Sequence, residues 1–326
     1  MLWPDAPVTA LSGTVQARPD GDAWRAAVRL TNDTAGPLDR QRLPVQRLSA
    51  DLEQRGARWT LSKLDADTGG GRVQGRGQRD APLSGSASAL GDWQGQLQAS
   101  GINPSLIWSR LAPAALDGTV SAGAVNPQAR DAAIDIDARI GPAGRQPRAS
   151  ALDGLRLREL RLQGRWSPQA GAPSRGILTL NQARLDAADG TLTASGRIDT
   201  ATPRFTGQVG LDLPGVRGRW QGDLAQTDGN GDLTIELGDA ARLLAWLRGL
   251  QDLPWAGERI RTLLDTQPGL QAQGSAAWRL QWQGGLGALG FPGGSAASAS
   301  PRVDSNLSVP RLALQRDGPG DGDRTE

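Results

Sequence analysis

The stretch GILTLNQARLDAADGTLTASGRI, at residues 176–198, decides the fold of this chain. Leu178 and Leu180 alternate with polar residues ahead of the Asp-Gly pair at 189–190, and the alternation resumes at Leu192. Such alternation is typical of a strand with one apolar and one polar face. Asp-Gly between two alternating runs favours a tight turn. The stretch therefore predicts a β-hairpin, and its pattern recurs along the chain.

A second copy of this hairpin lies upstream. Residues 59–77, WTLSKLDADTGGGRVQGRG, align without gaps on residues 178–196. A Trp-Gln-Gly strand follows each copy, beginning at Trp93 in the first and at Trp220 in the second. Repetition on this scale indicates an array built from one supersecondary unit.

The sequence downstream of each copy predicts a short helix that contains a tryptophan. In the first copy, Asn103 is a suitable N-cap for a helix over residues 104–111, with proline at its first position. In the second, Asp239 is a suitable N-cap for a helix over residues 240–248, and a further helix up to residue 265 completes an insert over 239–265. Both copies then return to strand.

These patterns predict a mainly β fold of repeated antiparallel hairpins with short inserted helices. The expected organisation has four parts. They are the N-terminal strands of the array at 1–42, repeat module one at 43–152, repeat module two at 153–284, and a Gly/Ala/Ser-rich linker with the last strands and a polar tail at 285–326.

The composition of the 326 residues excludes several kinds of chemistry. His, Cys and Tyr are absent, and Lys63 is the only lysine. The sequence pI of about 10.1 reflects this lack of groups that titrate near neutral pH, because the net charge is only +2. Acidic and basic residues are interspersed, which argues against nucleic acid as a partner. Disulfides, thiolate chemistry and histidine-based catalysis are excluded.

Three groups of polar residues have spacings that suggest a functional site. Residues 228–239 have acidic residues at spacings like those of a calcium-binding loop, but their apolar residues alternate as in a strand. Asp135 and Asp137 resemble a glycosidase pair, but they lie on the polar side of an alternating run. Ser62 and Lys63 are expected to point to opposite faces. We therefore predict no catalytic, cofactor or metal residues and no enzyme activity.

The tryptophans admit two interpretations. They are in phase with the apolar positions of their strands, so they could fill an ordinary core or line an open apolar groove. The rest of the apolar set is rich in Leu, Ala and Gly, which favours a spacious lining. The predicted lining comprises Trp59, Leu61, Val73, Trp93, Leu97, Ile134, Ile136, Leu178, Leu180, Leu192, Ile198, Leu211, Leu213, Trp220, Leu233, Ile235, Trp278, Leu280 and Trp282.

The runs LRLRELRLQGRW, ARLDAADGTLTASGRID, WQGDL, INPSLIWSRLAPAALDGTVSAG and LTIELGDAARLLAWLRGL resemble the repeat region of the TamB family. This family belongs to the AsmA-like superfamily, and the resemblance covers roughly residues 43–284. It implies an elongated, curled, β-taco-like groove in the periplasm whose apolar concave face takes phospholipid acyl chains or nascent outer-membrane protein. It also implies an inner-membrane anchor, absent from this chain, and an Omp85-type (TamA-like) outer-membrane barrel as partner of the full-length protein.

The leading hypothesis is therefore a groove protein that supports outer-membrane biogenesis, by phospholipid transport between membranes or by assembly and translocation of outer-membrane proteins. The alternative is a non-catalytic structural passenger or adhesin, a β-solenoid at the cell surface. An outer-membrane barrel is disfavoured, because tyrosine is absent and phenylalanine occurs only twice.

Overall fold

The structure is a computed structural model of the chain. It describes residues 8–80, 91–111, 113–126, 132–144, 157–169, 172–225, 228–249, 262, 270–284 and 302–316.

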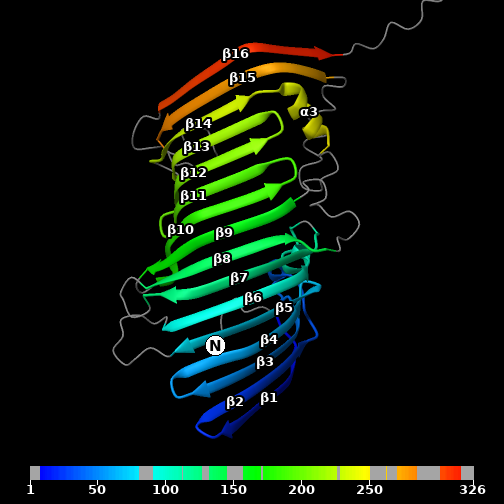
Figure 1. Ribbon diagram of the computed structural model, residues 1–326, viewed down its shortest axis with the longest axis vertical. Coiled ribbons are helices and arrows are strands. Elements are labelled where there is room, and N and C mark those ends of the chain that lie inside the picture. Colours follow the sequence, from blue (N-terminus) through cyan, green and yellow to red (C-terminus); the bar gives the residue numbers. More distant parts are fainter. Residues whose placement is uncertain are drawn as a thin grey trace, which may run out of the picture. The chain divides into compact units, whose positions relative to one another are not determined.

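One antiparallel sheet dominates the described residues (Figure 1). Its sixteen strands follow one another in the sheet in the same order as in the sequence, so each is paired with its neighbours along the chain. The mainly β fold of repeated hairpins is thus confirmed. Tertiary contacts divide the chain into two units, the first made of Met1–Asp153 and Leu157–Ala183, the second of Gly154–Arg156 and Arg184–Glu326.

The first unit holds the first nine strands, most of the tenth, and two short helical elements. Their bounds are β1 Leu11–Asp20, β2 Ala23–Asn32, η1 Leu38–Arg40, β3 Val45–Arg55, β4 Arg58–Thr68, β5 Gly71–Asp80, β6 Asp92–Ile102, α1 Pro104–Ile107, β7 Leu116–Val125, β8 Ala133–Pro142, β9 Leu157–Gln169 and β10 Ala172–Ala187.

The second unit holds the end of β10, the remaining strands and one helix. Their bounds are β11 Thr191–Asp199, β12 Arg204–Leu213, β13 Val216–Ala225, β14 Asn230–Leu237, α3 Ala240–Arg248, β15 Leu270–Gln283 and β16 Arg302–Arg316.

Both hairpins expected from the repeat are present. The Asp-Gly pair at 189–190 lies in the turn between β10 and β11, where the Ala187 amide donates to the Gly190 carbonyl at 2.8 Å. In the other copy, Gly69 and Gly70 connect β4 to β5 with φ of 57° and 73°. A positive φ at two successive residues is the geometry that favours glycine at such turns.

The first predicted helix is shorter than expected. The Asn103 side chain caps α1 by accepting from the Ser105 amide at 3.1 Å, as predicted, but the helix ends at Ile107. The prediction that it continues to residue 111 was wrong, because Trp108 has an extended backbone with φ −139° and ψ 111°. Trp108 therefore follows the helix instead of lying in it.

The second predicted helix is confirmed. The Asp239 side chain caps α3 by accepting from the Arg242 amide at 2.9 Å, and Leu244 is buried on its inner side. The helix packs against β15. The further helix expected up to residue 265 lies outside the described residues, apart from Thr262, as do the linker over 285–301 and the tail over 317–326.

The sheet of the described residues has little conventional core. Each described strand packs chiefly against its sheet neighbours, and the buried apolar residues are mostly alanines. No large side chain of the described residues is completely buried. A sheet with one apolar face ordinarily buries that face against a second layer. The apolar face of this sheet therefore needs another covering.

Candidate functional site

Cross-strand register places the apolar side chains of the first unit on one side of its sheet, the apolar face of unit 1. Six residues on the successive strands β4 to β9 form a row across this face, because each is the cross-strand partner of the next. The row is Leu61, Gly77, Gly95, Ala122, Ile136 and Gly164. Trp59, Val73, Trp93, Leu97 and Ile134 share this face by alternation. The sheet thus carries apolar and small side chains together on one side.

Leu178 and Leu180 belong to the same face through β10. A Cβ added to Gly164 would lie 3.5 Å from Leu178 Cδ1 and 3.8 Å from Leu180 Cα, so both leucines flank the glycine row. Leu180 is buried, whereas Trp59 keeps 43% and Leu97 keeps 40% of its surface exposed. Large apolar side chains of the strands are therefore accessible from this face.

The second unit has an equivalent apolar face, the apolar face of unit 2. Its longest row is made of apolar partners on successive strands, which are Ala194, Val209, Trp220, Leu233 and Leu280. The remaining predicted lining residues of this unit, Leu192, Ile198, Leu211, Leu213, Ile235, Trp278 and Trp282, share the face by alternation. All nineteen predicted lining residues thus lie on the apolar face of their own unit.

Aromatic side chains cluster on the apolar face of unit 2. The rings of Phe205 and Trp220 stack with centroids 5.3 Å apart and an interplanar angle of 27°. Trp282 retains only 4% exposure and lies against Gly231, since a Cβ there would be 2.4 Å from Trp282 Cη2. The same Cβ would be 3.0 Å from Trp220 Nε1. Glycine in the middle strand therefore lets two indoles approach the sheet and each other.

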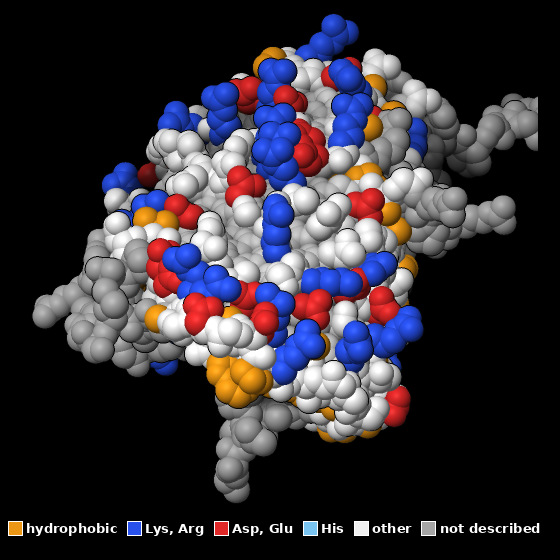
Figure 2. All heavy atoms as spheres, turned by 60° about the horizontal axis from the view of Figure 1, so that its bottom comes forward, with side chains coloured by type: hydrophobic (Ala, Val, Ile, Leu, Met, Phe, Trp, Pro, Cys, Tyr) orange, Lys and Arg blue, Asp and Glu red, His pale blue; other side chains and the backbone are white. Residues whose placement is uncertain are grey.

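In both units, the opposite side of the sheet is polar. Basic and acidic side chains mix on the face that Figure 2 presents, and orange side chains occupy only small areas of it. Neighbouring strands are joined there by ion pairs, as between Arg58 and Asp80 at 2.7 Å and between Arg165 and Asp135 at 2.6 Å. Exposed pairs of this kind contribute little stability each. Their regular placement indicates a solvated face.

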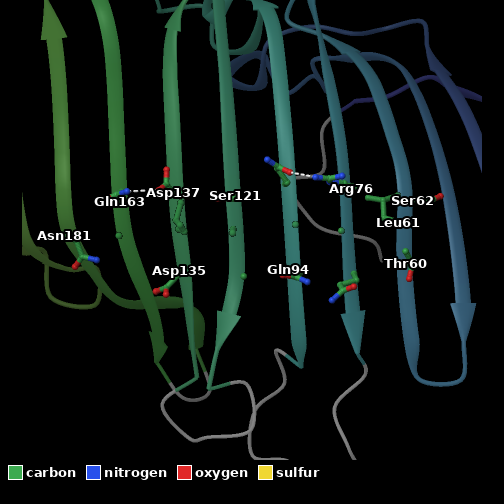
Figure 3. Close-up of a pocket in the computed structure, with 18 residues that line it drawn as sticks. Thr60, Leu61, Ser62, Arg76, Gln94, Ser121, Asp135, Asp137, Gln163 and Asn181 are labelled. Carbon is green, nitrogen blue, oxygen red and sulfur yellow. Dashed lines mark hydrogen bonds between the residues drawn. The ribbon is translucent and has the colours of Figure 1, made fainter.

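A hollow of the first unit lies on this polar side. It is a trough of about 880 Å³ that crosses the strands from β4 to β10 (Figure 3). Among its lining residues, Gln163 donates to its cross-strand partner Asp137 at 2.7 Å, and Arg76 donates to its cross-strand partner Gln96 at 3.1 Å. Its lining takes up to three successive residues from each strand, and the bulky apolar-face neighbours Trp93 and Leu97 are not among them. The trough is therefore a hydrogen-bonding surface.

A second trough, of about 870 Å³, lies on the polar side of the second unit. Asp232 belongs to its lining and accepts from Arg279 at 2.7 Å and from Gln281, another lining residue, at 2.7 Å. Asp232 lies in the 228–239 stretch, whose acidic residues are spaced like those of a calcium-binding loop, but the sequence alone predicts neither trough. The sequence does contain a pattern related to the troughs, since Gln, Ser and Asp recur at alternate strand positions. Only the strand register shows that these positions line up in rows across the sheet.

The paired carboxylates set the acid sensitivity of the fold. The Arg165 guanidinium, hydrogen-bonded to Asp135, holds the pKa of that carboxyl below its usual value. Arg72 and Arg58 likewise lower the pKa of Asp65 and Asp80. A pKa lowered on folding contributes stability above the unfolded value, about 3.9 for aspartate, and that stability is lost as the pH falls toward the folded pKa.

We therefore expect the melting temperature to stay level from about pH 5 to pH 8 and to fall below about pH 4. The level region follows because the chain has no histidine or cysteine side chain to titrate there. Calorimetry across this pH range checks the prediction. Asp135→Asn should reduce the decline in acid, and a strong dependence between pH 5 and pH 8 would contradict the assignment.

The two sides of the sheet offer different chemistry. The apolar faces can bind hydrocarbon, and the polar troughs can hydrogen-bond to water or to polar groups. The described parts of the chain hold no cluster of three or more His, Cys, Asp or Glu side chains placed to bind a metal ion.

The fold and the two faces of the described residues define a class of protein, the antiparallel β-sheet with one apolar and one polar face. No family model, curated protein or solved structure matches the chain. Within the described residues, no helix has the length and apolar character needed to span a membrane.

Proposed function

We propose that the chain is a periplasmic hydrophobic-groove protein of the TamB/AsmA-like type. It would support outer-membrane biogenesis by carrying phospholipid between membranes or by assisting outer-membrane proteins. The observation that carries the proposal is the apolar face, which in the described residues has large exposed side chains such as Trp59, near the start of β4, and Leu97, in the middle of β6. An Omp85-type outer-membrane barrel as partner belongs to the same proposal.

Hydrocarbon is a physically suitable occupant of such a face. Burying apolar surface contributes about 0.8 kcal/mol for each methylene group removed from water. A ten-residue strand is about 33 Å long at ~3.3 Å per residue. One lipid leaflet contributes about half of a ~30 Å hydrocarbon core. An acyl chain can therefore lie along one strand without passing its ends.

Phospholipid is favoured over a protein client on chemical grounds. A nascent membrane strand needs backbone partners as well as an apolar surface, because unpaired peptide groups are costly in an apolar setting. A sheet face presents side chains and no free backbone groups, so it supplies only the apolar part. Acyl chains require nothing else.

The alternative, a β-solenoid passenger, gains no specific support. Solenoid rungs stack in parallel around a closed core. The described strands instead pair antiparallel with their sequence neighbours, as β12 does with β13.

Site-specific photocrosslinking tests the proposal. Benzoylphenylalanine is introduced at Leu192, which is 40% exposed on the apolar face of unit 2, and in a matched variant at Thr193, which follows it on the polar face. In cells with radiolabelled phospholipid, we expect labelled lipid on the full chain only from position 192. Equal labelling from both positions, or labelling from neither, would reject the proposed function.

A further inference from the structure

Two buried indole donors on the apolar face of unit 2 lack an acceptor. The Nε1 atoms of Trp220 and Trp282 are inaccessible to solvent and have no hydrogen-bond partner among the described residues. Trp278, which shares β15 and the same face with Trp282, differs because its Nε1 donates to Ser305 Oγ at 2.9 Å. The missing acceptor is therefore particular to the Trp220 and Trp282 pair.

The strand between the two tryptophans brings them together. Trp282 on β15 is the cross-strand partner of Gly231 on β14. Trp220 on β13 is diagonal to Gly231, because its own partner on β14 is Leu233. A Cβ at Gly231 would be 2.5 Å from Trp282 Cζ2 and 3.0 Å from Trp220 Nε1, so both rings lean over this one glycine. Gly222, paired with Gly231, keeps the neighbouring floor free of side chains.

A buried donor without an acceptor destabilises the fold, because its hydrogen bond to water is lost and no hydrogen bond within the protein replaces it. Indole N–H groups in folded proteins usually find a partner when they are buried, and tryptophan is enriched where hydrocarbon meets polar lipid groups. Two unpaired donors within an apolar face therefore point to a ligand that is mostly hydrocarbon but carries an acceptor oxygen.

The surroundings indicate a neutral acceptor. The cross-strand partners of Trp220 are Val209 and Leu233, and those of Trp282 are Gly231 and Val303. None of these partners carries the positive charge that a phosphate or a carboxylate would need in an apolar setting. An ester carbonyl needs only a donor.

We propose that Trp220 and Trp282 form a subsite that binds the ester carbonyl oxygens of an acyl lipid. The subsite rests on the proposed function, because it places the acyl chains on the apolar face. It adds chemical selectivity to that face, since lipids with ester-linked chains would be held more tightly than ether-linked lipids of the same length.

A competition between two lipids tests the subsite. The full chain is incubated with an equimolar mixture of dioleoyl phosphatidylethanolamine and its dialkyl ether analogue, and retained lipid is measured by native mass spectrometry. We expect the ester lipid to be retained in about fivefold excess. The double variant Trp220→Phe/Trp282→Phe should retain both lipids equally, because phenylalanine keeps an aromatic ring and removes the donor.

Trp278→Phe is the matched control, because it removes a donor that already has a partner in Ser305. It should keep the ester preference. Equal retention of the two lipids by the unmodified chain, or loss of the preference in Trp278→Phe, would overturn the subsite while leaving the apolar face as a lipid site. Retention of neither lipid would overturn the proposed function as well. The comparison in the unmodified chain decides the matter even if the double variant does not fold.

Discussion

Replacing Gly222 by alanine is expected to destabilise the second unit by about 3 kcal/mol. Gly222 has a φ of 147°, which side-chain-bearing residues rarely adopt. A Cβ there would lie 2.3 Å from the Asn230 carbonyl oxygen and 2.5 Å from Gly231 Cα. Both contacts are with backbone of the paired strand β14, so relief requires that the strands separate. Urea unfolding of the full chain, followed by circular dichroism, measures the loss.

Gly218→Ala is the matched control on the same strand and the same face. Its added Cβ would meet nothing closer than Leu211 Cβ at 3.5 Å, an ordinary van der Waals contact. Alanine here should be neutral or stabilise by about 0.5 kcal/mol, because it restricts the unfolded chain. Equal unfolding midpoints for the two variants would contradict the close approach of β13 and β14 at Gly222.

Leu280→Asp is expected to lower the lipid retained by the chain by about tenfold or more. Leu280 is paired with Leu233 on β14 and with Ser305 on β16, and so lies on the apolar face of unit 2. A carboxylate at this position would have to be stripped of water before an acyl chain could cover it. Retained phospholipid, quantified by mass spectrometry of the purified full chain, measures the effect.

Gln283→Asp introduces the same charge on the same strand but on the polar face, where Arg302 is its cross-strand partner. It should leave lipid retention unchanged. The melting curves of both variants show whether each remains folded. Unaltered retention in Leu280→Asp would argue that lipid does not use this face.

Local sequence signals predicted the individual elements well. The Asp-Gly pair at 189–190 marks a real turn, and both Asn103 and Asp239 cap the helices that follow them. These signals act within a few residues and need no tertiary context. The length of α1 was overestimated, because nothing local shows that the backbone at Trp108 becomes extended.

The polar troughs and the indole pair could not be predicted in the same way. The sequence does not distinguish between Trp220, Trp278 and Trp282, because all three alternate in phase with apolar neighbours. Only the register shows that Trp278 meets the acceptor Ser305, whereas Trp220 and Trp282 meet over a glycine. Ser305 is 27 residues from Trp278 along the chain, beyond the reach of any local pattern.

The sequence by itself determined that this chain forms strands with one apolar and one polar face, because the period of two is a local property of extended backbone. The tertiary structure decided which side chains are neighbours across the strands. A one-residue change of register would exchange the two faces, and a two-residue change would keep the faces but separate Trp220 and Trp282 from Gly231. The faces therefore follow from periodicity, while the proposed subsite depends on the pairing of β13, β14 and β15.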